Sequence, residues 1–102
     1  MTRLQIEIPA WLIELSDDEY LLYELNKIVR EACDLIASFE RGYVRTDPER
    51  VLKRALTKLL LVRAISEVVI AIKKERTRRE FEDLKRKIEE MYEEIGKKLS
   101  KV

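Results

Sequence analysis

The chain has 102 residues, of which 40% are charged and 46% hydrophobic, and it contains only two Gly, two Pro and no His. A chain of this length has room for one domain and one modest core. Scarce Gly and Pro are typical of long helices and exclude an all-β fold, and the net charge of +1 by itself points to no partner.

The N-terminal segment alternates apolar and polar residues. Leu4, Ile6 and Ile8 are each followed or preceded by a polar side chain, which is the period of a half-buried strand. We therefore expect residues 1–15 to contain two parts. The first is an extended arm or short strand, and the second is a short helix that carries Trp11. A lone strand needs a partner, so the arm either pairs across a dimer or lies extended.

The first long helix is expected to begin after a serine. Ser16 followed by Glu19 has the spacing of a capping box, in which each side chain accepts a hydrogen bond from an otherwise unpaired backbone N–H. Apolar residues then recur every three or four positions as far as Phe39, and Gly42 is suited to end the helix. The pattern predicts a helix over residues 17–41.

A second helix is predicted over residues 47–75. Thr46 and Glu49 form another candidate capping box, with Asp47 as a rival cap. The first half of this helix has a polar and an apolar side, whereas eleven of the fourteen residues in 59–72 are apolar and point all round the helix. Three helices of this length cannot easily surround such a run, so we expect part of it to meet another subunit.

The octet KKERTRRE, residues 73–80, contains no apolar side chain. The apolar stripe changes phase across it, and Thr77 with Glu80 has capping-box spacing, so we predict a turn near Thr77 and a third helix over residues 78–100. One continuous helix with a solvated turn is the alternative. The predicted fold class is all-α, a single domain in which three main helices form a bundle with an extended N-terminal arm.

Charge is distributed unevenly along the chain. Residues 1–40 carry a net charge of −6, residues 41–79 carry +8 and residues 80–102 carry −1. The basic middle third could neutralise phosphates through contacts that are independent of base sequence. Alternatively, these residues pair with the acidic first helix or solvate the surface. The candidate nucleic-acid-binding residues are Arg45, Arg50, Lys53, Arg54, Lys73, Lys74, Arg76, Arg78 and Arg79.

Few residues are suited to catalysis. Without His the chain has no ordinary proton shuttle near neutral pH, no Ser-His or Cys-His nucleophile and no imidazole ligand for a metal. Cys33 is expected to be a small buried hydrophobe, and the glutamates within residues 89–94 a solvated helix face rather than a Mg²⁺ site. Arg63 and Glu67 are expected to form a local ion pair. We predict a non-enzyme with no catalytic residue, metal or cofactor.

The composition also indicates where the protein works. Glu, Lys and Arg dominate the charged residues and Asn and Gln occur once each, as is typical of heat-loving organisms. A lone cysteine forms no internal disulfide, and the N-terminus lacks the layout of a signal peptide, so we expect a cytoplasmic location. No apolar run reaches the roughly 20 residues of a membrane span.

Two stretches, GYVRTDPERVLKRALTKLL and ISEVVIAI, residues 42–60 and 65–72, resemble the small subunits of archaeal CRISPR surveillance complexes, in particular the type I-A small subunit. The resemblance also rests on the length of the chain. It implies a non-catalytic subunit of an antiviral defence complex, in which copies stack and line a groove for nucleic acid with Lys and Arg. Contact residues of that family are not transferable one by one, so the candidate residues above rest on charge.

Two alternatives stand beside this hypothesis. The opening TRLQIEIPAWL, residues 2–12, looks like that of ribbon-helix-helix repressors and antitoxins, which implies that Arg3, Gln5 and Glu7 face DNA. The predicted first helix, residues 17–41, is longer than the first helix of that fold. The second alternative is a helical scaffold or assembly protein, an oligomer or subunit of a larger complex that binds no nucleic acid.

Overall fold

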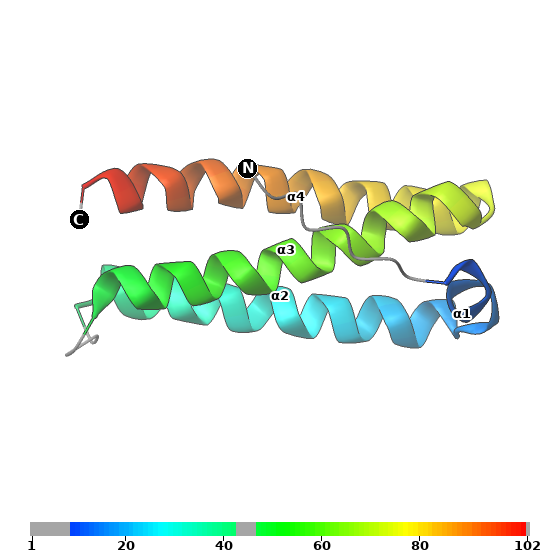
Figure 1. Cartoon of the computed structure of the whole chain (residues 1–102), viewed down its shortest axis with the longest axis horizontal. Coiled ribbons are helices and arrows are strands. Elements are labelled where there is room, and N and C mark those ends of the chain that lie inside the picture. Colours follow the sequence, from blue (N-terminus) through cyan, green and yellow to red (C-terminus); the bar gives the residue numbers. More distant parts are fainter. Residues whose placement is uncertain (1–8, 43–46, 102) are drawn as a thin grey trace.

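The computed structural model describes residues 9–42 and 47–101, and the chain folds into helices with no strand among those residues. The helices are α1 (Ala10–Leu15), α2 (Asp18–Glu40), α3 (Pro48–Ile72) and α4 (Glu75–Ser100). The three long helices lie side by side and alternate in direction, with α3 between α2 and α4 (Figure 1). The predicted all-α bundle of three main helices is confirmed.

The core lies where α3 faces its two neighbours. α3 packs along α2 and along α4, whereas α2 and α4 touch at few positions, and α1 packs on α3. Because α3 supplies core contacts in two directions, its apolar residues point to more than one side. The buried apolar residues are Ile13, Leu25, Val29, Ala32, Ile36, Leu52, Ala55, Leu59, Val62, Val69, Phe81, Leu84, Ile88 and Ile95.

The N-terminus of α2 is capped by Asp17, and the predicted Ser16 cap is wrong. Asp17 Oδ1 accepts a hydrogen bond from the backbone N–H of Tyr20 at 3.0 Å. The Ser16 hydroxyl instead donates to the carbonyl of Ile13 at 2.7 Å, because Ser16 ends the preceding short helix α1. Ser and Asp are both good caps. Because α1 and α2 are joined by so short a connection, Ser16 is used to end α1 and Asp17 is left to cap α2.

The connection from α2 to α3 begins at Gly42 and ends at Asp47. Gly42 has a φ of 71°, a left-handed conformation that residues other than Gly adopt with difficulty, and its N–H donates to the carbonyl of Phe39. α3 starts at Pro48, and its cap is Asp47, whose Oδ1 accepts from the N–H of Arg50 at 3.2 Å. The rival candidate, Thr46, lies outside the described residues.

The chain turns between α3 and α4 as predicted, but at Lys73 and Lys74, before the expected position. Both residues have extended backbones. α3 therefore ends at Ile72 and not at the predicted residue 75, and α4 begins at Glu75 and not at the predicted residue 78. Thr77 is therefore inside α4, and the capping box predicted for it is wrong. Its hydroxyl donates to Asp18 Oδ2 at 3.2 Å, which ties the start of α4 to the start of α2.

The N-terminal predictions are only partly covered by the structure. The expected short helix with Trp11 is present as α1, and α2 has 23 residues. The alternating arm, residues 1–8, lies outside the described residues, and so do Arg3, Gln5 and Glu7 of the ribbon-helix-helix resemblance.

The capping geometry predicts unequal effects of two neighbouring substitutions. Asp17→Ala removes the acceptor for a helix N-terminal N–H and should lower the free energy of unfolding by about 1 kcal/mol. Ser16→Ala removes only a bond at the end of a six-residue helix and should lower it by less. Urea unfolding of both variants measures the difference, and a larger loss for Ser16→Ala would contradict the assignment of the cap.

Candidate functional site

The basic residues predicted to bind nucleic acid lie at opposite ends of the bundle. Arg50, Lys53 and Arg54 are in the first two turns of α3, and the residues from Lys73 onward are at its far end and in α4 (Figure 1). Along α3 these groups are about 30 Å apart at 1.5 Å per residue. Arg45 lies outside the described residues. The described candidates thus form two clusters and not one strip.

At the turn between α3 and α4, acidic groups of other segments lie against the basic residues. The Lys73 ammonium is 2.8 Å from Asp18 Oδ1, and it donates to the backbone carbonyl of Glu14 at 3.1 Å. Only 13% of the Lys73 side chain is exposed. Asp18 is flanked in sequence by Asp17 and Glu19, so the acidic start of α2 offsets much of the positive charge at this end.

The remaining cations of this cluster differ in how far they are engaged. Arg79 pairs with Glu75 one helical turn earlier, at 3.1 Å, and both side chains are well exposed. Arg78 donates to the carbonyl of Lys73 at 3.5 Å. Lys74 and Arg76 are exposed, and no carboxylate within the described part of the chain lies at ion-pair distance from either. These two are the cations of the cluster most available to a ligand.

The start of α3 carries the second positive cluster. Lys53 pairs with Glu49 at 2.8 Å, and the hydrogen bond to that carboxylate, followed by its charge, raises the pKa of Lys53. Arg50 and Arg54 are exposed, and neither forms an ion pair with any residue of 9–42 or 47–101. The antiparallel α4 ends at the same end of the bundle (Figure 1).

The apolar run in 59–72 is divided between the core and the solvent. Leu59, Val62 and Val69 are fully buried, and between them lies an outward stripe that we call the α3 ridge. Leu60 and Leu61 are 54% and 46% exposed. The stripe continues at steps of three and four residues, the spacing of one helix face. The α3 ridge consists of Leu60, Leu61, Ala64, Val68 and Ala71.

A rigid polar cluster borders the α3 ridge on the side of α4. Arg63 pairs with Glu67 at 3.3 Å, which confirms the predicted local ion pair, and also lies 3.7 Å from Glu89 of α4. Its guanidinium carbon is 5.7 Å from the ring centre of Tyr92, within range of a cation–π contact. Burial raises the pKa of Tyr92. Tyr92 also lines a hollow with Leu56, Thr57 and Leu60 of α3.

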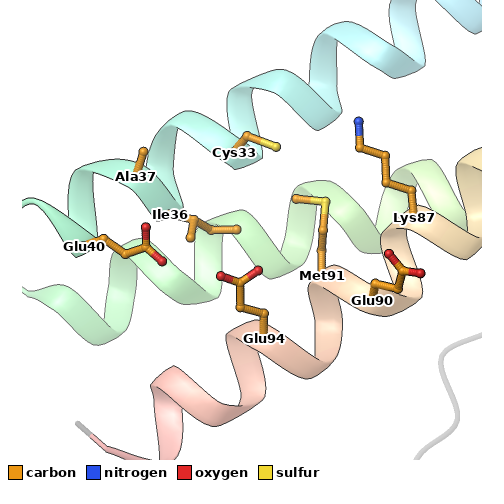
Figure 2. A pocket seen from close by; sticks show the side chains of 8 residues that line it. All are labelled: Cys33, Ile36, Ala37, Glu40, Lys87, Glu90, Met91 and Glu94. Atoms are coloured by element: carbon orange, nitrogen blue, oxygen red, sulfur yellow. The ribbon is translucent and has the colours of Figure 1, made fainter.

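On the opposite side of the bundle a groove runs between α2 and α4. Figure 2 shows one part of it, in which Cys33 and Ile36 of α2 face Met91 of α4 with α3 behind them. The adjoining hollow is lined by residues including Leu22 and Leu84, and Lys87 borders both hollows. We call the combined depression the α2/α4 groove. Cys33 is half-buried beside the core, so its prediction as a buried hydrophobe is only partly met.

The far end of the α2/α4 groove is closed by an ion-pair network. Lys98 Nζ lies 2.7 Å from Glu40 of α2 and 3.5 Å from Glu94 of α4. The hydrogen bond to Glu40 is the largest cause that raises the pKa of Lys98. The network links the end of α2 to the end of α4, whose backbones otherwise meet at few positions.

Within the described residues, no three Cys, Asp or Glu side chains gather as a group that could hold a metal ion. None of the described helices is both long and apolar enough to cross a membrane. No protein-family model, curated protein or solved structure matches the chain. The surfaces described above, on residues 9–42 and 47–101, are the α3 ridge, the α2/α4 groove and the two basic clusters.

Proposed function

We propose that this chain is a non-catalytic helical subunit of a larger assembly, and that it binds another protein through the α3 ridge. The observation that supports the proposal most is the exposure of Leu60 and Leu61 in the middle of the central helix. Exposed single leucines are common on protein surfaces. Here they belong to a mostly apolar stripe in which Ala64 and Val68 are half-buried, and apolar residues gathered on a surface are a mark of an interaction site.

The contrast with α4 strengthens this interpretation. The outward positions of α4 are charged, with Glu82, Asp83 and Arg86 exposed on successive turns, as expected of a solvated helix. The outward positions of α3 from residue 60 onward are mostly apolar, with Glu67 as an exposed charged residue among them. The exposed parts of Leu60 and Leu61 together equal about one leucine, and covering one leucine side chain is worth roughly 1.5–3 kcal/mol.

The α3 ridge should be dispensable for folding and necessary for assembly. Leu60→Glu with Leu61→Glu changes exposed positions, so the free energy of unfolding should change little. In extracts of the native cells, the wild-type chain should elute in a large complex and this double variant at the size of the free chain. The matched control Glu82→Lys with Arg86→Glu, on the charged face of α4, should elute like wild type. A ridge variant that stays in the large complex would reject the ridge as the contact.

Nucleic-acid contact is the second candidate function, favoured by Arg50 and Arg54, which are exposed and form no ion pair with the residues that the structure describes. Such cations can neutralise phosphates. A basic surface within an assembly is also what the resemblance to CRISPR small subunits implies. The site would be the start of α3, because in the other cluster Lys73 already pairs with Asp18 and Arg79 with Glu75.

The two basic clusters can be separated by charge reversal. If the start of α3 contacts phosphates, Arg50→Glu with Arg54→Glu should weaken binding to single- and double-stranded DNA and RNA alike and reduce the salt slope by about 2. Arg76→Glu with Arg79→Glu should have the smaller effect, because Arg79 already pairs with Glu75. Fluorescence anisotropy at two salt concentrations measures both. The reverse order would place the contact at the octet, and a wild-type chain that binds nothing at low salt would reject this function.

A further inference from the structure

The bundle has two dissimilar surfaces on opposite sides. The α3 ridge points away from α2 and α4, because the ridge residues alternate along α3 with residues buried beneath those helices. The α2/α4 groove opens on the other side, with α3 behind it (Figure 2). The molecule is flat, with extents of 43 × 32 × 19 Å. One broad side is thus a protruding helix, and the other is a depression between two helices.

The α2/α4 groove combines an apolar floor with an acidic rim. Leu22, Cys33, Ile36, Leu84 and Met91 supply the floor. Five carboxylates line the groove against one lysine, Lys87. Two of the five, Glu40 and Glu94, share Lys98, and Asp83 lies 3.6 Å from Arg86 in an exposed pair. Glu80 and Glu90 have no ion-pair partner among the described residues. An occupant of this groove should be an amphipathic helix with positive charge.

The outward face of α3 in this same chain has that chemistry. Its first two turns present Arg50, Lys53 and Arg54, and the α3 ridge follows. Between residues 50 and 71 this face includes one carboxylate, Glu67, which pairs with Arg63 and with Lys85 of α4. Ala64 and Ala71 are small, which lets a second pair of helices approach to the 8–10 Å typical of helix packing.

The dimensions also agree. From residue 50 to residue 71 the outward face of α3 is about 32 Å long, and from residue 22 to residue 40 the groove is about 27 Å long, both at 1.5 Å per residue. α2 and α4 touch at few positions, so a helix laid between them completes a four-helix arrangement, the geometry of common helical bundles.

We propose that the α3 ridge of one copy packs into the α2/α4 groove of a second copy. The proposal rests on the proposed function, in which the ridge is a protein contact, and it adds the identity of the partner and the surface that receives the ridge. Two different surfaces meet in this contact, so it is heterologous, and two joined copies together still have one free ridge and one free groove. Copies therefore add one after another along the thin dimension of the molecule, and an assembly grows until a ring closes or another component caps it.

Two variants with complementary defects test this arrangement. The ridge variant, Leu60→Glu with Leu61→Glu, keeps an intact groove. The groove variant, Glu80→Lys with Glu90→Lys, keeps an intact ridge and changes two exposed residues that lack ion pairs within the described part of the chain. Circular dichroism and thermal unfolding of each should match wild type, which shows that neither change disturbs the fold.

Sedimentation velocity from micromolar to near-millimolar protein gives the readout. Wild type should form species that grow with concentration and shrink at high salt, since part of the contact is between charges. Each variant alone should remain at the monomer mass of 12.2 kDa. A mixture of the two should form a species of twice that mass and grow no further, because only one productive contact remains.

Three results would overturn the proposal. A wild-type chain that stays monomeric rules out the second copy as partner. If the ridge variant is nevertheless absent from the large complex in cell extracts, the ridge contacts a different protein. A groove variant that associates like wild type indicates that two ridges pack symmetrically. Two monomeric variants whose mixture forms no dimer rule out the pairing of ridge with groove.

Discussion

The packing of α3 against both α2 and α4 is the constraint on which the rest of the structure depends. α2 and α4 meet at few positions, so almost all burial in the bundle passes through the central helix. One flank of α3 buries Leu59 and Val62, and Leu60 and Leu61, which lie between them in sequence, face solvent. Since these two residues are apolar as well, the packing of the described helices leaves an apolar surface exposed on one side, and the separation of α2 from α4 creates the groove on the other side.

Electrostatics organises the two ends of the bundle differently. At the turn between α3 and α4, Lys73 lies against Asp18 of α2 and the carbonyl of Glu14 of α1. This lysine of the basic octet therefore links the end of α3 to α1 and α2. Only 13% of the Lys73 side chain is exposed, which makes this pair less screened than a surface pair. At the start of α3, the guanidinium groups of Arg50 and Arg54 have no such partner among the described residues. The positive charge of the middle third is therefore offset in part at each end, by Asp18 and Glu75 at one and by Glu49 at the other.

Local patterns in the sequence predicted much of this fold because helix periodicity and caps act over a few residues. The three long helices, the turn in the octet, the role of Gly42 and the Arg63–Glu67 pair were all predictable from spacing. The cap at Asp17 was not, since Ser16 ends α1 and this depends on where two helices meet. The turn at Lys73 was placed too late, because its anchor, Asp18, is far away in sequence.

The candidate surfaces were predictable only in part. The excess of apolar residues in 59–72 indicated a contact beyond the bundle, and the structure shows which of them face outward. The single basic strip was not recovered, because one helix of 25 residues separates its two halves. The α2/α4 groove had no signal in the sequence, since it depends on the distance between two helices that are not adjacent in the chain.

The claim that underlies these proposals is that the outward face of α3 is open in the free chain and covered in the assembled one. Hydroxyl-radical footprinting read by mass spectrometry measures this residue by residue. In dilute protein, Leu60 and Leu61 should be oxidised readily, and in concentrated protein they should become protected together with Met91 of the groove. Protection of both leucines in the most dilute sample would show that the chain covers its own ridge, and that result would contradict the account.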